Sequence, residues 1–153
     1  MDFGTFNGND STTIEQFLAT GGGVVSGLDM GFGGTQLSAP NINNASAETT
    51  FFMFELVSTD LGAGDFTVTH DDGFLLFENG SAVDGVVGPT GQQTNTVTGF
   101  GGGTFSLLYV ATNGNPSVLN VDTNAAPVPV PASLPLLAAG FGGLFWMRRR
   151  KAA

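Results

Sequence analysis

Several short stretches of the chain alternate apolar and polar residues, which is the pattern of half-buried β-strands. In the stretch 66–70, Phe66, Val68 and His70 alternate with threonines. The stretch 104–112 has the same period on one face, at Phe105, Leu107 and Tyr109, with Leu108 and Val110 on the opposite face. Glycine, asparagine and aspartate residues separate such stretches and favour tight turns. The sequence therefore predicts about eight short strands in an all-β, antiparallel β-sandwich of jelly-roll type.

Two dipeptides with strong turn preference, Asp72-Gly73 and Asn79-Gly80, stand between the predicted strands 66–70, 74–78 and 81–87. Both dipeptides tolerate the positive φ angles of a type I′ turn, which joins the two strands of a hairpin. The pattern predicts two hairpins in series, and hence a three-stranded antiparallel meander.

The remaining stretches predict one helix, one central strand and connecting loops. Thr12 and Glu15 have the spacing of a capping box, and a helix over about 13–19 places Phe17 on an apolar face. The nearly continuous apolar run at 49–58 indicates a central strand buried on both faces. The other expected elements are a weak strand at 24–32, loops at 33–47 and 88–103 with a short strand at 95–98, and a turn at 113–116 that pairs 117–122 back onto 104–112.

The chain is uncharged over 132–147 and then ends in a basic cluster. A helix over the uncharged residues is roughly 24 Å long, and snorkelling basic side chains extend its reach across a ~30 Å hydrocarbon core. A helix buried in a protein core is the alternative, but the stretch has no polar face. We therefore predict an extracytoplasmic domain over 1–122, an Ala/Pro linker over 123–131 and one transmembrane helix over 132–151 with its basic end in the cytoplasm.

A proline motif precedes the uncharged stretch and consists of Val128, Pro129, Val130, Pro131 and Ala132. The basic cluster that follows it consists of Arg148, Arg149, Arg150 and Lys151. This order resembles the PEP-CTERM sorting signal of Gram-negative bacteria, in its Val-Pro-Leu-Pro-Ala subclass, with Val130 in place of leucine. The resemblance implies export by the general secretory route, processing by an exosortase, which is a membrane transpeptidase, and a place in the exopolysaccharide or biofilm matrix.

The resemblance also implies a path for the protein. The domain crosses the inner membrane into the periplasm and then reaches the cell surface or the extracellular matrix, and its C-terminus is cytoplasmic before processing. Export of this kind needs a signal peptide, yet residues 1–10 have neither a basic n-region nor an apolar h-region. We therefore expect that the natural protein begins upstream of Met1.

The charged residues are divided unequally along the chain. All four basic residues lie in the C-terminal cluster, so the rest of the chain contains all thirteen acidic residues and no lysine or arginine. Such a domain repels nucleic-acid phosphates, which excludes nucleic-acid binding, and it attracts divalent cations and cationic partners. The sequence has no cysteine, which excludes disulfides, thiolate metal sites and cysteine nucleophiles.

The segment 65–80 contains His70-Asp71-Asp72-Gly73, Leu76 and Asn79-Gly80. This spacing resembles the signature of the protective-antigen-type β-sandwich domains of bacterial surface proteins and yeast flocculins. The resemblance implies that Asp71 and Asp72, joined by a cis peptide, bind Ca²⁺ and, through it, a sugar hydroxyl. Carboxylates are hard ligands that suit Ca²⁺. The alternative is that both aspartates only stabilise a turn, and the tightness of a two-residue hairpin favours this simpler interpretation.

The sequence favours a binding or structural role over catalysis. His70 is the only histidine and shares a face with Phe66 and Val68, which favours a buried strand residue over a ligand or a base. A Ser-His-Asp triad would have to use it, so we expect no enzyme. We expect a structural or adhesive component of the cell surface or matrix. A Ca²⁺-dependent carbohydrate-binding module that binds extracellular polysaccharide is the alternative, and a glycoside hydrolase with paired carboxylates is a third hypothesis.

Overall fold

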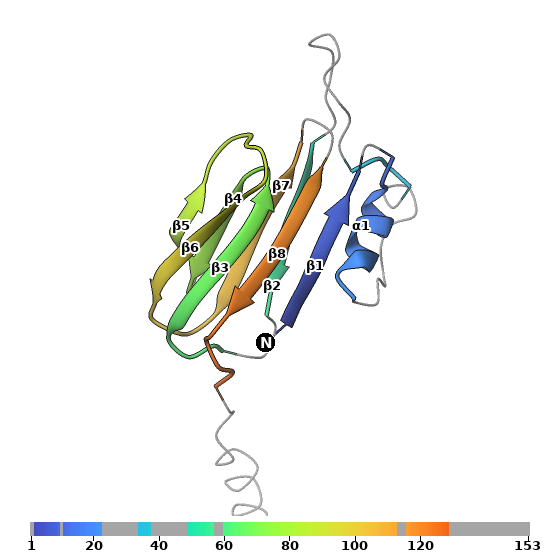
Figure 1. The fold of residues 1–153 in the computed structure, drawn as a ribbon. Helices are drawn as coiled ribbons and strands as arrows, with labels where there is room; N and C mark the ends of the chain where they lie inside the picture. Colours follow the sequence, from blue (N-terminus) through green and yellow to red (C-terminus); the bar gives the residue numbers. More distant parts are fainter. Residues whose placement is uncertain are drawn as a thin grey trace, which may run out of the picture.

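The described residues form eight strands and one short helix in a computed structural model (Figure 1). The structure describes residues 2–9, 11–22, 34–37, 49–56, 60–112 and 116–128. The elements are β1 (Asp2–Gly8), α1 (Ile14–Thr20), β2 (Thr50–Glu55), β3 (Gly64–Asp71), β4 (Phe74–Glu78), β5 (Ser81–Val86), β6 (Gln93–Phe100), β7 (Phe105–Ala111) and β8 (Ser117–Thr123).

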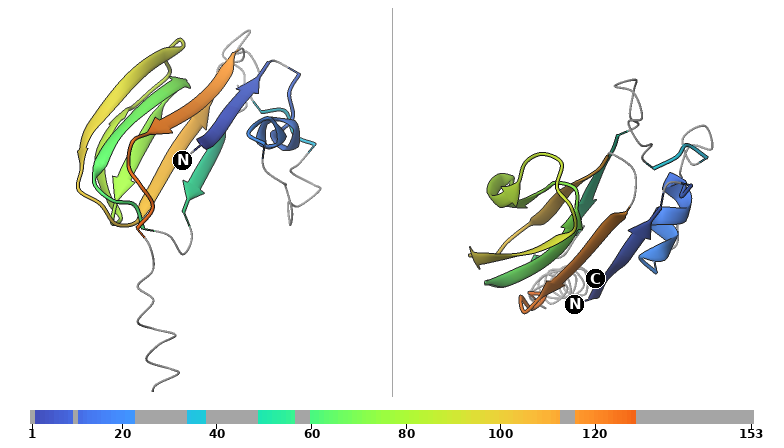
Figure 2. Two further views of the ribbon diagram at one scale, coloured as in Figure 1. Left: turned by 60° about the horizontal axis from the view of Figure 1, so that its bottom comes forward. Right: turned by 45° about the horizontal axis from the view of Figure 1, so that its top comes forward.

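The strands form two four-stranded sheets that face each other, in the orders β1-β8-β3-β6 and β2-β7-β4-β5 (Figures 1 and 2). All neighbouring strands in both sheets are antiparallel. Of the eight described strands, only β4 and β5 follow one another within the same sheet. This strand order is that of an eight-stranded jelly roll, and it confirms the predicted all-β antiparallel sandwich.

The predicted three-stranded meander is wrong, because β3 and β4 belong to different sheets. Residues 71–73 carry the chain across the sandwich instead of closing a hairpin. The alternation shows only that one face of each strand is buried. It is expected both when β3 and β4 are neighbours in one sheet and when they lie in two sheets that face each other, so it does not distinguish the two arrangements. The second predicted hairpin is confirmed: Glu78 lies opposite Ser81, and Asn79 and Gly80 have φ angles of 50° and 79°.

Two further predictions of strand pairing are also corrected. β8 does not pair back onto β7; it lies between β1 and β3 in the opposite sheet. The predicted polar loop at 88–103 contains β6, which is longer than the short strand expected at 95–98 and pairs with β3 along its length.

The apolar run at 49–58 forms β2, which is an edge strand and not a central one. Phe52 faces the core, whereas Phe51 and Met53 on the other face are 66% and 53% exposed. The prediction of burial on both faces is therefore wrong. A continuous apolar run is compatible with two kinds of strand. Both faces of the strand can be buried, or one face can be buried while the other forms an apolar patch on the protein surface.

The predicted helix is confirmed as α1, but its cap lies one residue further along. Thr13, not Thr12, is the N-cap residue, and its hydroxyl accepts a hydrogen bond from the Gln16 N–H at 3.3 Å. The Gln16 side chain in turn accepts from the Thr13 N–H at 2.9 Å, so Gln16 takes the part that was expected of Glu15. The helix lies beside β1, on the side of the sandwich where β1 and β2 face each other (Figure 2).

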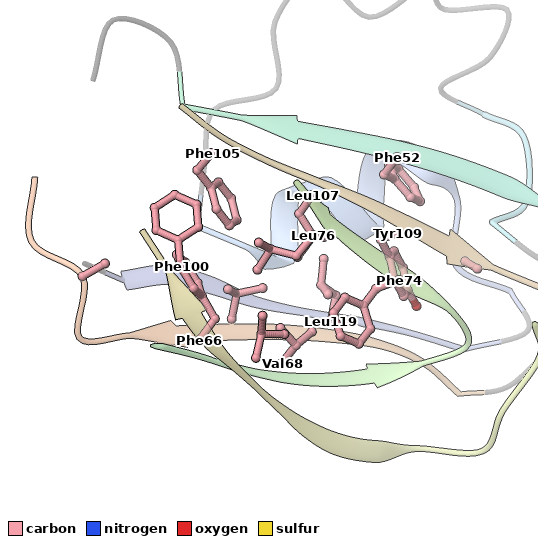
Figure 3. Close-up of a cluster of buried hydrophobic side chains, with 14 of the residues drawn as sticks. Phe52, Phe66, Val68, Phe74, Leu76, Phe100, Phe105, Leu107, Tyr109 and Leu119 are labelled. Atoms are coloured by element: carbon pink, nitrogen blue, oxygen red, sulfur yellow. The ribbon is translucent and has the colours of Figure 1, made fainter. Parts of the chain in front are cut away.

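The core between the sheets is rich in aromatic rings (Figure 3). Phe66 stacks on Phe105 with 4.9 Å between ring centroids, and Phe100 meets Phe66 edge to face at 5.2 Å. Tyr109 lies towards the other end of the core, 5.9 Å from Phe17. Because these side chains come from both sheets and from α1, one continuous core joins all three layers.

The chain stays attached to the sandwich after β8 ends at Thr123. Ala125 is buried, and the Val128 N–H donates to the Asp60 carbonyl at 2.8 Å. The Gly62 N–H donates to the Ala126 carbonyl, also at 2.8 Å. Part of the predicted linker therefore packs against the domain.

Several predictions concern residues outside the described ranges. These are the proline motif after Val128, the transmembrane segment with its basic cluster, the weak strand at 24–32, most of the loop at 33–47 and most of the turn at 113–116. Among the described residues, α1 is the sole helix, and neither its length nor its apolarity is that of a membrane span.

Candidate functional site

The two candidate aspartates lie at the end of the sandwich opposite to the point where the chain leaves it. Asp71 is the last residue of β3 and pairs with Val118 near the start of β8, whereas Phe66 pairs with Thr123 at the end of β8. Five strand residues separate these levels, or about 17 Å at ~3.3 Å per residue. In Figure 1, the β3 arrowhead points to the aspartate end and the β8 arrowhead points to the exit.

Both aspartates are buried: Asp71 is 6% exposed and Asp72 is 3% exposed. The peptide bond between them is cis, which is the isomer that the resemblance to protective-antigen-type domains implies. Their carbonyl oxygens have partners from the core, since the Tyr109 hydroxyl donates to the Asp71 carbonyl and His70 Nδ1 contacts the Asp72 carbonyl. The backbone of the pair is thus fixed from inside the sandwich.

The carboxylate of Asp72 joins two segments that are distant in the sequence. Its Oδ2 accepts from the Thr112 N–H at 2.7 Å, just after β7, and its Oδ1 accepts from the Thr90 N–H at 3.3 Å, in the connection between β5 and β6. The Thr90 hydroxyl also donates to the Asp72 carbonyl at 3.0 Å. Asp72 therefore holds the loops at this end of the sandwich in place.

Burial raises the pKa of both carboxyl groups above its ordinary value. For Asp71, the negative charge of Asp72 raises the pKa further, while a backbone hydrogen bond from Gln92 opposes the shift. For Asp72, the hydrogen bonds from Thr112 and Thr90 oppose the effect of burial on the pKa. The described residues include no lysine or arginine to balance the pair. Two adjacent carboxylates in this environment favour the uptake of a proton or a cation.

We expect the free energy of unfolding to fall as the pH rises through the carboxyl range in the absence of metal. The folded protein holds these protons more tightly than the unfolded chain, where the ordinary pKa is 3.8. The free-energy cost of ionising the two buried carboxyl groups is absent below that pKa, and it develops as the pH rises through the raised pKa values of the folded state. Urea unfolding at several pH values, with a chelator present, measures this. The free energy of unfolding of Asp71→Asn should fall less steeply with pH than that of the wild type, and an equal pH dependence of the two proteins would contradict the prediction.

The two carboxylates are oxygen donors of the chemical type that suits a hard divalent cation. The two carboxylates supply up to four oxygens, and each Asp72 oxygen that accepts one N–H keeps a further lone pair. No cluster of three or more histidine, aspartate or glutamate side chains that could hold a metal occurs among the described residues. A Ca²⁺ ion prefers six to eight oxygens, so at this pair it would keep positions for backbone oxygens, water or ligand hydroxyl groups.

His70 is a buried strand residue, as its register with Phe66 and Val68 predicted. Its Nε2 lies 2.8 Å from Asn95 Oδ1 on the neighbouring strand β6, and its ring packs 4.6 Å from the ring of Phe74. Both ring nitrogens have protein partners, which suits a residue that positions the backbone of the aspartate pair.

Removal of the Tyr109 hydroxyl is expected to destabilise the fold. Burial raises the pKa of Tyr109, and its O–H donates to the carbonyl of Asp71 in the interior. The variant Tyr109→Phe leaves that carbonyl without this donor, at an expected cost of about 1–3 kcal/mol. Denaturant unfolding of wild type and variant measures the difference, and equal midpoints would show that the bond contributes nothing.

An apolar groove of about 280 Å³ adjoins the aspartate pair on the outer face of the β2-β7-β4-β5 sheet. Its floor includes Phe51, Leu75, Leu108 and Val110, and the segment 86–89 forms a wall. Its polar end consists of Asp72 and Thr112. We call this feature the apolar groove. The prediction from sequence missed it, although apolar residues on both faces of these strands were the signal.

Gly73 allows the wall of the apolar groove to approach the sheet. A Cβ atom on Gly73 would lie 2.9 Å from the Val86 carbonyl oxygen and 3.2 Å from that of Gly88. Both contacts are with backbone, which does not move aside as a flexible side chain would. Glycine at this position is therefore required by the close packing and not by a hairpin turn.

No protein-family model matches the chain, and no curated protein matches its sequence. Among solved structures, the chain is similar to the crystal structure of a GH26-CBM35 β-(1,4)-mannanase from Podospora anserina, with 15% sequence identity and a TM-score of 0.27. The match covers 85% of this chain and 29% of the mannanase chain, less than one third of the latter. The function proposed for this chain rests on the geometry of its own residues.

Proposed function

We propose that the described domain is an adhesive, carbohydrate-binding module of an exported cell-surface or matrix protein, and that Ca²⁺ held by Asp71 and Asp72 takes part in binding. The observation that supports this is the pair of adjacent buried carboxylates at one end of the sandwich, with no lysine or arginine among the described residues. Burial, and then the negative charge of Asp72, raise the pKa of Asp71, and a bound divalent cation would offset both effects by stabilising the ionised carboxylates.

The chemistry of the pair supports an oxygen-rich ligand. Two aspartates occupy only part of the coordination sphere of Ca²⁺, and sugar hydroxyl groups are hard oxygen donors of the kind this ion prefers. When bound, the ion would supply positive charge that this domain otherwise lacks. The protein's own residues hold the pair in place: the N–H groups of Thr90 and Thr112 donate to the Asp72 carboxylate, and the Tyr109 hydroxyl donates to the backbone carbonyl of Asp71.

The position of the pair fits a surface module. The chain leaves the sandwich at the end opposite to Asp71 and continues towards the proline motif and basic cluster. If that tail anchors the protein in the inner membrane until an exosortase processes it, the aspartate end faces away from the membrane. The support for the sorting step is the sequence of the tail, residues 128–132 and 148–151.

A purely structural role for the pair is the second candidate, because the Asp72 carboxylate already accepts two backbone hydrogen bonds. In that case the aspartates shape the loops and the domain adheres, or builds the matrix, without a metal. We propose no enzymatic activity in either case. Hydrolysis of glycosidic bonds in any member of a set of polysaccharides incubated with the protein would contradict this.

Co-sedimentation of the full chain with insoluble cellulose, chitin, mannan and xylan tests the proposal. We expect at least one polymer to retain the protein in Ca²⁺ and to release it when a chelator is added. The variant Asp71→Asn should fail to bind, and Asp84→Asn, which removes one charge from an exposed position on β5, should bind as wild type does. Retention that persists after the chelator is added would contradict the role of Ca²⁺. If no polymer retains the protein, the purely structural role of the aspartate pair is favoured.

A further inference from the structure

We infer that the apolar groove receives an O-acetyl substituent of a neutral polysaccharide whose hydroxyl groups reach the aspartate pair. This inference rests on the proposed function and names the class of carbohydrate that the site would select. Three observations support it: the chemistry of the lining, its place next to Asp72, and the charge of the domain.

The lining is almost entirely hydrocarbon. Phe51, Leu108 and Val110 present side chains on the outer face of the sheet, and the described polar side chains of the groove are those of Asp72 and Thr112 at one end. A sugar hydroxyl placed against this floor would lose its hydrogen bonds to water without replacement, whereas a methyl group would gain from burial.

The groove and the aspartate pair share a residue, which sets how a ligand can lie. Asp72 belongs to the pair and also lines the groove. A sugar whose hydroxyl groups reach a cation at the pair therefore places its neighbouring atoms over the groove. The volume of about 280 Å³ lies near the lower end of small-molecule sites, roughly 300–1,000 Å³. It suits one substituted sugar residue and is too small for a long lipid chain or a peptide helix.

The charge of the domain disfavours anionic substituents over the floor of the groove, away from a cation at the aspartate pair. The chain has thirteen acidic residues, and its four basic residues all lie at 148–151. Uronates, sulfate esters and phosphate esters would meet repulsion without a basic partner. An acetyl ester is neutral, ends in a methyl group and replaces a hydroxyl that the groove cannot satisfy, so it combines the properties that the lining favours.

The groove is formed before any ligand arrives. The wall segment packs against Gly73, and Thr90, just beyond it, donates both its N–H and its hydroxyl to Asp72. Because the loop is already held, binding does not have to order it, and the apolar contact contributes more of its energy to affinity.

Affinity electrophoresis of the full chain in Ca²⁺ tests the inference with natively O-acetylated xylan and glucomannan, each compared with the same polymer after mild alkaline de-esterification. We expect the acetylated form to bind about tenfold more tightly or better, since one methyl group in an apolar pocket is worth this order of discrimination. The variant Phe51→Ser should remove the preference. Met53→Ser, on the same exposed face but outside the groove lining, should keep it.

Each outcome separates the inference from the proposed function. Equal, Ca²⁺-dependent binding of both polymer forms would overturn the inference and leave the proposed function in place. No binding of either polymer in either form would overturn the inference, while the proposed function is decided by the co-sedimentation test over the wider set of polymers. If Met53→Ser loses the preference for the acetylated polymer as fully as Phe51→Ser does, the preference comes from the whole exposed face of β2. That result would overturn the role of the apolar groove. The thermal midpoints of the two variants serve as the check on folding.

Discussion

The variants Asp71→Asn and Asp72→Asn are each expected to abolish the stabilisation of the protein by Ca²⁺. In the wild type, Ca²⁺ at ~100 times its dissociation constant should raise the free energy of unfolding by about 2.7 kcal/mol, because the ion binds the folded state alone. Each variant keeps the shape of the side chain but removes one of two adjacent buried carboxylates. The thermal midpoint with Ca²⁺ and with a chelator measures the effect.

Asp84→Asn is the matched control for this prediction, since it removes the same formal charge from an exposed residue of β5. We expect it to retain the full Ca²⁺-dependent shift. A shift that survives in both Asp71→Asn and Asp72→Asn would place the ion elsewhere. Without metal, Asp71→Asn should be more stable than wild type at neutral pH, because it removes the repulsion that helps to raise the pKa of Asp71.

The variant Phe17→Ala is expected to cause the largest loss of stability, about 3–5 kcal/mol, which is typical of a fully buried phenylalanine. Phe17 has no solvent exposure and is the buried side chain of α1, with Ile14 and Leu18 partly buried beside it. Its ring lies 5.1 Å from Phe52 and 5.6 Å from Phe6, so it bridges the edges of the two sheets. Its removal leaves a cavity where β1 and β2 face each other.

Denaturant unfolding measures this loss, and Met53→Ala is the control. Met53 is a large apolar residue of similar length, but it lies on the exposed face of β2. We expect its replacement to change the free energy of unfolding by less than about 0.5 kcal/mol. If the two variants were destabilised equally, α1 would not be part of the core.

The strands could be predicted from the sequence, but their assignment to sheets could not. Alternation at 66–70 and 105–111 shows that one face of each strand is buried, and it does not show which strand lies beside it. Asn79-Gly80 was sufficient to predict its hairpin, because both residues adopt the positive φ angles of the turn. Asp72-Gly73 has the same character, yet it crosses between the sheets.

The difference between the two dipeptides lies in distant partners. The Asp72 side chain accepts hydrogen bonds from Thr90 and Thr112, which are 18 and 40 residues away, and Gly73 is packed against the backbone of Val86 and Gly88. None of these contacts is visible in the local sequence. Turn preference reflects only residues that are close in the sequence. At Asp72-Gly73, contacts with residues far away in the sequence decide the path of the chain.

The candidate site was predicted in part. The resemblance of the segment 65–80 predicted Asp71 and Asp72 as ligands, and their role as ligands stays a prediction; their burial and hydrogen bonds depend on the assembled fold. The apolar groove was missed because Phe51 was interpreted as part of a strand buried on both faces, and Leu108 and Val110 were placed on the second face of their strand without a role. Apolar residues on both faces of a strand indicate that its outer face is either packed or available for binding, and sequence does not separate these cases.

Isothermal titration of the full chain with Ca²⁺, with a neutral polysaccharide present and absent, measures whether Asp71 and Asp72 hold an ion that takes part in carbohydrate binding. We expect one saturable ion per chain in the wild type, tighter binding when the polysaccharide is present, and no measurable binding in Asp71→Asn. A wild-type titration without saturable heat, or one that Asp71→Asn leaves unchanged, would contradict it.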